Sequence, residues 1–291
     1  HPETDLVVLT GDVVSGTSIP ATIAGIQKYH EEWSKAVKPM EERGVPWAVA
    51  LGNHDPDGCG TLITNWGIVK MDQKHSMSLT EEGPVWVGHE VAGNYHIEVT
   101  DSSSSSSENG TVVASLFFID AARDWTIPDV EVKWFIQEAE KLNNGRKTAL
   151  PLFMFFHIPL LEFMQVYNTA VTHGNRSEDV CCSDHQSGMY AAAVTHGVRG
   201  IFVGHDHSSN YCGKLEGDDV VLCYGQKSGF GYYNPPWGWH GARVIKISLN
   251  ETEASGITWN HFIVNDEGEF VESVAHEPTG TGQTKCAGRK K

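Results

Sequence analysis

The sequence lacks an apolar run long enough to cross a lipid bilayer. Its longest uncharged stretch near the hydropathy maximum is 148–161, and Pro151, His157 and Pro159 interrupt it. A membrane-spanning helix needs about 20 consecutive apolar residues, so we expect no membrane-spanning segment. The chain also opens without an initiator methionine or a signal-peptide pattern, and we expect a piece whose true start lies upstream of His1.

Positive charge is scarce. The 291 residues contain 21 Lys and Arg against 37 Asp and Glu, a formal net charge of −16. This balance argues against nucleic acid or an anionic membrane surface as the main partner, because the average field attracts neither. It suits a protein that collects cations. With 40% hydrophobic and 20% charged residues, the chain can bury a sizeable core, and global disorder is excluded.

Cysteine is limited to six residues, and no two of them have the Cys-x-x-Cys spacing of a metal or redox motif. Six cysteines allow 15 pairings. Cys212 and Cys223 flank a Gly-Asp-Asp turn in a predicted hairpin, so we favour a disulfide between these two. Cys181 and Cys182 are adjacent, and neighbours rarely bond each other.

Three N-glycosylation sequons are present, at Asn109, Asn175 and Asn250. Together with the even number of cysteines they favour the secretory pathway or an extracellular location. A cytoplasmic protein with reduced core cysteines and chance sequons remains the alternative.

Short apolar strands alternate with amphipathic helices along the chain. Strands are predicted at 6–10, 47–51, 95–99, 112–119, 152–156, 200–203, 220–224, 243–248 and 257–264, and helices at 20–42, 130–142 and 188–195. Continuous apolar strands between helices are typical of an α/β sheet covered on both faces. The strand-rich last part predicts a second sheet packed on the first.

Two local details can be tested directly. For the first helix we predict Ser18 as the N-cap, Gly44 as the stop and a kink or early end at Pro39. The serine-rich segment 102–107 is predicted as the tip of a hairpin between strands 95–99 and 112–119.

Four of the predicted strands end at residues of metal-ligand type. These residues are Asp12, Asn53 with His54, His157, and His205 with His207. In open α/β sheets the site lies beyond the carboxyl ends of the strands, so we expect these side chains at one rim. Oxygen and imidazole donors without thiolate suit Zn, Mn or Fe, and a bridging carboxylate can hold two such ions for phosphoryl transfer.

These blocks resemble a known family. Four blocks occur in the order found in calcineurin-like metallophosphoesterases. They are Gly11-Asp12, Gly52-Asn53-His54-Asp55, residues 156–160 and Gly204-His205-Asp206-His207. The later segments are most similar to the single-domain branch related to purple acid phosphatases. The resemblance covers nearly the whole chain and implies one domain over 1–291, an α/β/β/α sandwich of two mixed sheets flanked by helices.

The resemblance also implies a binuclear metal centre of Fe, Zn or Mn ions. Asp12 would bridge the two ions. Asn53, His157 and His205 would complete one metal site, and His207 would serve the other.

The implied chemistry is hydrolysis of a phosphate ester, with a monoester favoured over a diester. A metal-bound hydroxide would attack the phosphorus. His54 would protonate the leaving group as a general acid, oriented by Asp55. Substrate identity and oligomeric state stay open.

The chain departs from the family at its start, because the Asp-x-His block of the first strand is absent. We expect that block, with one strand and one helix, upstream of His1. As given, one metal site has four ligands and the other only two. We therefore expect poor occupancy of the second site and weak or no activity of this polypeptide. The alternative is a non-catalytic phosphate-binding or protein-binding module on the same fold.

Overall fold

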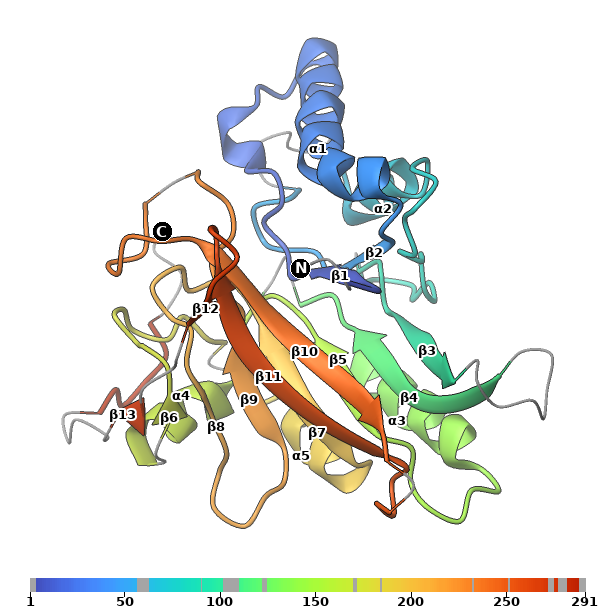
Figure 1. Cartoon of the computed structure of the whole chain (residues 1–291). Helices are drawn as coiled ribbons and strands as arrows, with labels where there is room; N and C mark the ends of the chain where they lie inside the picture. Colours follow the sequence, from blue (N-terminus) through green and yellow to red (C-terminus); the bar gives the residue numbers. More distant parts are fainter. Residues whose placement is uncertain are drawn as a thin grey trace. The chain divides into compact units, whose positions relative to one another are not determined.

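The computed structural model describes residues 4–56, 63–89, 91–101, 110–121, 125–169, 172–183, 185–231, 233–250, 252–271, 275–276 and 282–287. The chain divides into two compact units (Figure 1). Unit 1 comprises His1–Tyr95, Phe118–Ile127 and Phe155–Ile158. Unit 2 comprises His96–Phe117, Pro128–Met154 and Pro159–Lys291. Each unit is described by itself below.

The helices of the described residues are one 3-10 turn and five α-helices. They are η1 (Gly16–Ser18), α1 (Ile23–Arg43), α2 (Asn65–Asp72), α3 (Asp129–Asn143), α4 (Leu161–Thr169) and α5 (Met189–Thr195). The helices predicted from the sequence correspond to α1, α3 and α5. None of the described helices is both long and apolar enough to cross a membrane.

The described strands form three sheets. The strands are β1 (Val7–Leu9), β2 (Trp47–Val49), β3 (Tyr95–Asp101), β4 (Thr111–Phe118), β5 (Leu152–Phe155), β6 (Thr172–His173), β7 (Val198–Val203), β8 (Cys212–Gly213), β9 (Val221–Tyr224), β10 (Gly241–Leu249), β11 (Ile257–Asn265), β12 (Phe270–Val271) and β13 (Ala275–His276). One sheet pairs β1 with β2, and another joins β10, β11 and β12. The third has eight strands in the order β13-β6-β8-β9-β7-β5-β4-β3.

The four strands expected to share one rim belong to two sheets. β1 pairs with β2 in parallel, whereas β5 and β7 lie next to each other in the eight-stranded sheet. The sequence analysis did not predict which of these strands pair with each other. An apolar run identifies a strand, but its own residues do not specify which other strand it pairs with.

Unit 1 is built around a core that buries large aromatic side chains. Trp33 of α1 and Trp47 of β2 are fully buried. Both indole N–H groups donate to Asp72 Oδ1 at the end of α2, at 2.7 and 3.0 Å. The hydroxyl of Ser78 donates to Asp72 Oδ2 at 2.5 Å. A buried carboxylate is stabilised by such donors, so Asp72 ties α1, α2 and β2 together.

Helix α1 differs from its prediction at the N-cap and at Pro39, and agrees with it at Gly44. Thr22, not Ser18, is the N-cap, and its Oγ1 accepts a hydrogen bond from Gly25 N at 3.0 Å. Ser18 lies in η1 instead. Pro39 does not end the helix, which continues to Arg43 because its buried stripe holds it against the core. Gly44 stops it as predicted, with a φ of 64° that favours glycine.

Unit 2 is layered. β7 and β9 pair in parallel and β8 and β9 antiparallel, so the large sheet is mixed. Phe117 of β4 packs edge-on against Phe135 of α3. Trp259 of β11 packs against Phe153 of β5, with ring centroids 5.2 Å apart. In Figure 1 the β10–β11 hairpin crosses in front of β7 and β9, and α3 and α5 lie behind. The later strands thus form the second sheet that the sequence predicted.

Two disulfides link described residues of unit 2. The predicted bond between Cys212 and Cys223 is present and joins directly paired residues of β8 and β9. The second bond, Cys182–Cys286, spans 104 residues of sequence and was not predicted. Cys181, next to Cys182 in the chain, is partly buried. Cys59 lies outside the described residues, as does the predicted hairpin tip at 102–107.

Candidate metal centre

The centre of unit 1 is the pair formed by Asp12 and His157. Asp12 follows β1 and His157 follows β5, and the Nε2 atom of His157 lies 3.0 Å from Asp12 Oδ2. Asp12 has a φ of 54°, which is unusual for a residue other than glycine. Such backbone strain persists only where the surroundings hold it, and it is concentrated at functional sites.

The second ring nitrogen of His157 fixes the orientation of the imidazole. Nδ1 donates to the carbonyl oxygen of Thr10 at 2.6 Å, and the side chain is almost completely buried. A hydrogen bond at one nitrogen leaves the other to bind a metal ion. Nε2 of His157, turned toward Asp12, is therefore the atom that would serve as the ligand.

The pair is strongly polarised. Burial by itself raises the pKa of Asp12, but the charge and hydrogen bond of His157 and the backbone N–H of His54 outweigh it and hold this pKa well below its usual range. Burial would lower the pKa of His157, whereas Asp12 and the Thr10 carbonyl raise it. A cation bound here would take the place of the Nε2 proton.

Asn53, the third predicted ligand in unit 1, has an unsatisfied oxygen. Its Oδ1 atom is buried and has no hydrogen-bond partner among the described residues. A buried polar atom without a partner costs about 1–3 kcal/mol, so its presence needs an explanation. A hard metal ion is a natural partner for an amide oxygen. The donor set of Asp12, Asn53 and His157 thus fits a metal ion.

Asp55 ties the loops after β1 and β2 to each other. Its Oδ2 accepts hydrogen bonds from the backbone N–H groups of Asp12 (2.9 Å) and Gly52 (2.7 Å), and its Oδ1 accepts one from Val14 (3.2 Å). Burial and the nearby charge of Asp12 raise its pKa to about 7, and the N–H groups of Gly52 and Val14 act in the opposite direction. Asp55 therefore positions the backbone of the site, and its role in orienting His54 stays a prediction.

His54 contacts the site through its backbone. Its N–H donates to Asp12 Oδ1 at 2.8 Å, and its carbonyl accepts from Gly16 N at 2.8 Å. The first of these bonds holds Oδ1 of Asp12, whereas His157 contacts Oδ2 of the same carboxylate. The general-acid role of the His54 imidazole stays a prediction.

Two glycines make room for this arrangement. A Cβ on Gly11 would lie 2.6 Å from His157 Nδ1, and a Cβ on Gly52 would lie 2.3 Å from Asp12 Oδ1. Position 52 therefore requires glycine, because any side chain there would displace the Asp12 carboxylate.

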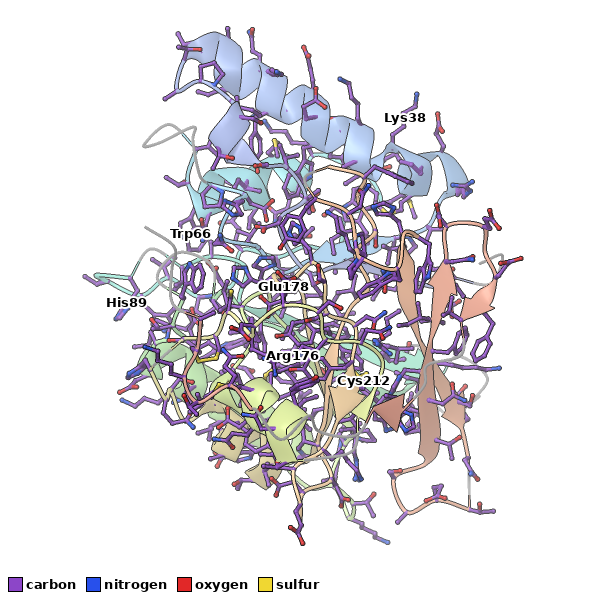
Figure 2. The ribbon with its side chains drawn as sticks, turned by 90° about the vertical axis from the view of Figure 1, so that its left-hand side faces the viewer. Lys38, Trp66, His89, Arg176, Glu178 and Cys212 are labelled. Carbon is purple, nitrogen blue, oxygen red and sulfur yellow. A yellow bond between two sulfur atoms is a disulfide. The ribbon has the colours of Figure 1, made fainter. Side chains whose placement is uncertain are left out.

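The remaining predicted ligands lie in unit 2, in the loop after β7. His205 has a φ of 72°, so it shares the left-handed conformation of Asp12. His207 stacks on the ring of Tyr233, with centroids 4.5 Å apart. The hydroxyl of Tyr233 donates to Glu178 Oε2 at 2.9 Å. Glu178, labelled in Figure 2, also accepts a hydrogen bond from the backbone N–H of Ser208.

Sequence reasoning missed the residue between the two histidines. Asp206 is buried, and its Oδ2 accepts hydrogen bonds from the Tyr224 hydroxyl at 2.5 Å and from Cys181 N at 3.2 Å. Burial raises its pKa to about 7, and the charge of Glu178 acts in the same direction. The only signal was its place between His205 and His207, where it fixes the loop that carries both.

Other predicted or candidate positions are not proposed as metal ligands. Asn175 follows β6 and Asn250 follows β10, whereas Asn109 lies outside the described residues, so glycosylation stays a prediction. His261 contacts the sulfurs of Cys212 and Cys223 at 3.9 and 3.8 Å. These sulfurs form a disulfide and have no thiolate to offer a metal ion.

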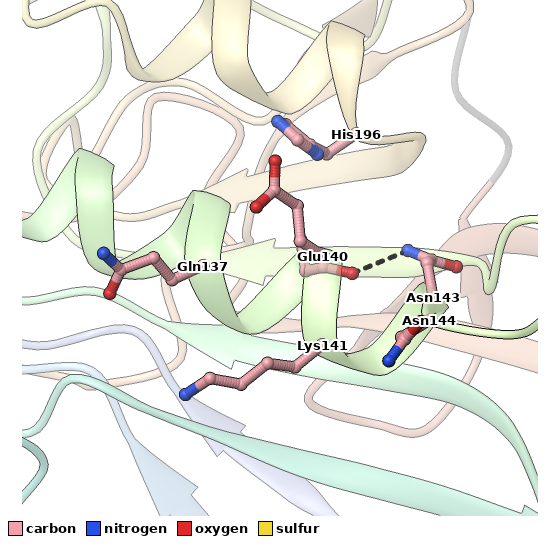
Figure 3. A pocket seen from close by; sticks show the side chains of 7 residues that line it. Gln137, Glu140, Lys141, Asn143, Asn144 and His196 are labelled. Carbon is pink, nitrogen blue, oxygen red and sulfur yellow. Dashed lines mark hydrogen bonds between the residues drawn. The ribbon is translucent and has the colours of Figure 1, made fainter.

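A surface hollow at the end of α3 has no part in the metal chemistry. The hollow is lined by Gln137, Ala139, Glu140, Lys141, Asn143, Asn144 and His196 (Figure 3). None of the predicted metal ligands is among these residues.

Comparison with known proteins connects these loops to a family. The family model described as calcineurin-like phosphoesterase matches residues 1–209. A probable inactive purple acid phosphatase 29 of Arabidopsis thaliana is 30% identical over 268 residues, covering 85% of this chain and 65% of that protein. A probable inactive purple acid phosphatase 28 from the same plant is 33% identical, with coverage of 85% and 64%. The chain thus spans slightly less than two thirds of the length of these relatives.

Two further relatives carry other names. Phosphatase DCR2 of Saccharomyces cerevisiae is 28% identical over 279 residues, covering 87% of this chain and 45% of that protein. The solved structure of a dimetal phosphatase from Danio rerio superimposes with a TM-score of 0.51 at 10% identity, covering 94% of this chain and 84% of the other. This likeness shows a shared metallophosphoesterase fold. With the family model covering well over half of its residues, the chain belongs to the calcineurin-like phosphoesterase family.

Proposed function

We propose that this chain is the metal-binding part of a phosphoesterase that hydrolyses a phosphate ester, and that its substrate is a monoester. The observation that carries the proposal is the Asp12–His157 pair, with His157 Nδ1 fixed by Thr10 and Nε2 turned to the carboxylate. The buried oxygen of Asn53, which has no hydrogen-bond partner among the described residues, supports it independently.

The proposed ligands of one ion are Asp12, Asn53, His157 and His205, and Asp12 and His207 serve a second ion. For the two histidines of unit 2 the support is the order of the motifs in the chain and the family. Iron, zinc or manganese bound there would polarise the phosphoryl group and lower the pKa of a water molecule.

The chain's own residues prepare this site before any ion binds. Gly11 and Gly52 let the two loops approach closely, and Asp55 holds them by three hydrogen bonds. We propose His54 as the acid that protonates the leaving oxygen, because it follows Asn53 directly and its backbone already contacts Asp12.

The test is hydrolysis of p-nitrophenyl phosphate by protein stripped of metal and reloaded with Mn²⁺, Zn²⁺ or Fe. We expect metal-dependent hydrolysis that Asp12→Asn reduces by about 100-fold or more, the magnitude typical for loss of a charge-stabilising group. Asp5→Asn, a change of the same kind at an exposed position, is the control and should leave the rate unchanged. Hydrolysis that needs no metal, or that Asp12→Asn does not reduce, would overturn the proposal.

The second candidate is a metal-binding module without catalysis. It is favoured by the names of the two Arabidopsis relatives, both of which call the protein probably inactive. This module would bind metal and phosphate and turn nothing over. Metal binding that depends on Asp12, combined with no hydrolysis in a chain extended to the full length of the relatives, would favour it over the enzyme.

We also propose the secretory pathway or the extracellular space as the location. Two disulfides support it, because such bonds persist in oxidising compartments. A mass decrease after enzymatic removal of N-linked glycans from the protein made in a eukaryotic host would support this location, and unmodified Asn175 and Asn250 would weigh against it.

A further inference from the structure

The loop after β7 that carries His207 is held by a second segment of unit 2, residues 176–183. Both oxygens of the Glu178 carboxylate accept a hydrogen bond, one from Ser208 N and one from the hydroxyl of Tyr233. The ring of Tyr233 in turn stacks on the imidazole of His207. Glu178 therefore binds both the loop and the ring against which this imidazole packs.

The same segment also holds the loop through its backbone. Ser177 N donates to Ser208 O at 2.8 Å, and Cys181 N donates to both oxygens of the buried Asp206, at 3.3 and 3.2 Å. Ser208 and Asp206 are the residues on either side of His207. The position of this imidazole therefore depends on where the segment lies.

Residues 282–287 fix segment 176–183 in turn. The Cys182–Cys286 disulfide joins the two, although its cysteines are 104 residues apart in sequence. Both cysteines are buried. The bond holds their Cα atoms 5.1 Å apart, so the segment cannot move away from residues 282–287 while the disulfide is intact.

Gln283 provides the main hydrogen bonds between these two parts of the chain. Its Oε1 accepts from Val180 N at 2.8 Å, and its Nε2 donates to Val180 O at 2.9 Å. Val180 is fully buried, and buried backbone groups need hydrogen-bond partners. The backbone of Gln283 is itself anchored on α4, because its N–H and carbonyl both bond to the side-chain amide of Asn168, at 3.2 and 2.6 Å.

We propose that Gln283 and Glu178 are positioning residues of the metal centre, and that residues 282–287 brace the loop that carries His205 and His207. The inference rests on the proposed function in treating these two histidines as metal ligands. Residues that hold metal ligands in place typically change the metal affinity by about 10–100-fold when they are replaced. Without the brace the chain keeps its fold, but its imidazoles are no longer held in the binding geometry.

The test is the Mn²⁺ dissociation constant of the whole chain, measured by equilibrium dialysis beside the free energy of unfolding of the metal-free protein. We expect Gln283→Ala and Glu178→Ala each to bind Mn²⁺ about tenfold more weakly than the wild type. A merely structural residue would lower the stability and leave the dissociation constant of the folded protein unchanged. Gln137→Ala, at an exposed position of α3, is the control and should leave both quantities unchanged.

Glu178→Gln tests whether the carboxylate acts through its hydrogen bonds. It keeps an acceptor for Ser208 N and a partner for the Tyr233 hydroxyl, so it should restore most of the Mn²⁺ affinity lost in Glu178→Ala. If Gln283→Ala does not fold, this pair of variants decides the matter.

Two outcomes would overturn the inference. They are wild-type affinity in Gln283→Ala or Glu178→Ala, and Glu178→Gln that binds Mn²⁺ as weakly as Glu178→Ala. In either case Mn²⁺ binding that Asp12→Asn still weakens would leave the proposed function standing. Wild-type protein that binds no Mn²⁺ contradicts both.

Discussion

At the scale of single residues, the site in unit 1 depends on the close approach of Gly52 to the backbone and carboxylate of Asp12. Gly52 has no positive φ, yet a Cβ there would lie 2.3 Å from both Asp12 N and Asp12 Oδ1. No flexible side-chain end is available to yield, because the backbone of Asp12 is itself in the way. The glycine is required by the space that the Asp12 carboxylate occupies.

Gly52→Ala should therefore destabilise the fold by about 1–3 kcal/mol, the usual cost of overpacking, and should weaken metal binding. Urea unfolding and metal titration measure the two effects. Gly229→Ala is the control, since a Cβ there meets nothing within 4 Å. Equal stability and equal metal binding in both variants would contradict the packing argument.

His261 is the residue from which a pH effect on stability is expected. Burial, then the charges of Arg243 and His173, lower the pKa of His261 to about 4, and Arg243 Nη1 donates to its Nδ1 at 3.0 Å. In the unfolded chain its pKa is 6.5. Between these values the unfolded state binds a proton and the folded state does not, so stability falls as the pH drops from 6.5 to 4.

This loss amounts to at most about 3 kcal/mol, from about 1.4 kcal/mol per pKa unit. His261→Asn keeps an acceptor for Arg243 and does not titrate, so it should flatten the pH dependence of the free energy of unfolding over this range. His185→Asn, at an exposed histidine, is the control. A slope that is the same in wild type and His261→Asn would contradict the assignment.

At the scale of elements, the sequence located the strands and helices of the site but not all of their ends. The mis-assigned N-cap of α1 illustrates the reason. Ser18 and Thr22 are both residues that cap helices, and only the course of the chain through η1 decides which of them stands at the first turn. The early end predicted at Pro39 does not occur, because the tertiary packing of Trp33 and Val37 outweighs the local cost of the proline.

Thr22→Ala should lower the stability of the chain by about 1 kcal/mol, because it removes the hydrogen bond to Gly25 N. Chemical unfolding followed by circular dichroism measures the loss. Thr22→Ser keeps the hydroxyl and should restore most of the stability. If serine and alanine destabilise equally, the cap is not the cause.

At the scale of the whole molecule, local motifs could be predicted and long-range partners could not. The four short blocks that carry the proposed ligands were found in the sequence because each follows its own apolar strand. Three features join segments that are distant in sequence. They are the Cys182–Cys286 bond, the pairing of β1 with β2 and the hydrogen bonds from Cys181 N to Asp206. Nothing in either partner alone specifies them.

The two disulfides should contribute unequally. Cys182–Cys286 spans 104 residues and Cys212–Cys223 spans 11, and a cross-link that closes a longer loop restricts the unfolded chain more. Replacing the first pair by alanine should therefore cost about 2 kcal/mol more than replacing the second in the chain-entropy treatment. Urea unfolding of the two double variants measures this difference. A larger loss from the Cys212–Cys223 pair would contradict the expectation.

The most direct test of the metal centre is the Mn²⁺ dissociation constant of Asn53→Ala beside that of the wild type. If the unpartnered oxygen of Asn53 is a ligand, the variant should bind Mn²⁺ at least about tenfold more weakly. Its metal-free stability should be unchanged or higher, because a buried unsatisfied atom is removed. Unchanged Mn²⁺ affinity together with a loss of metal-free stability would contradict the account.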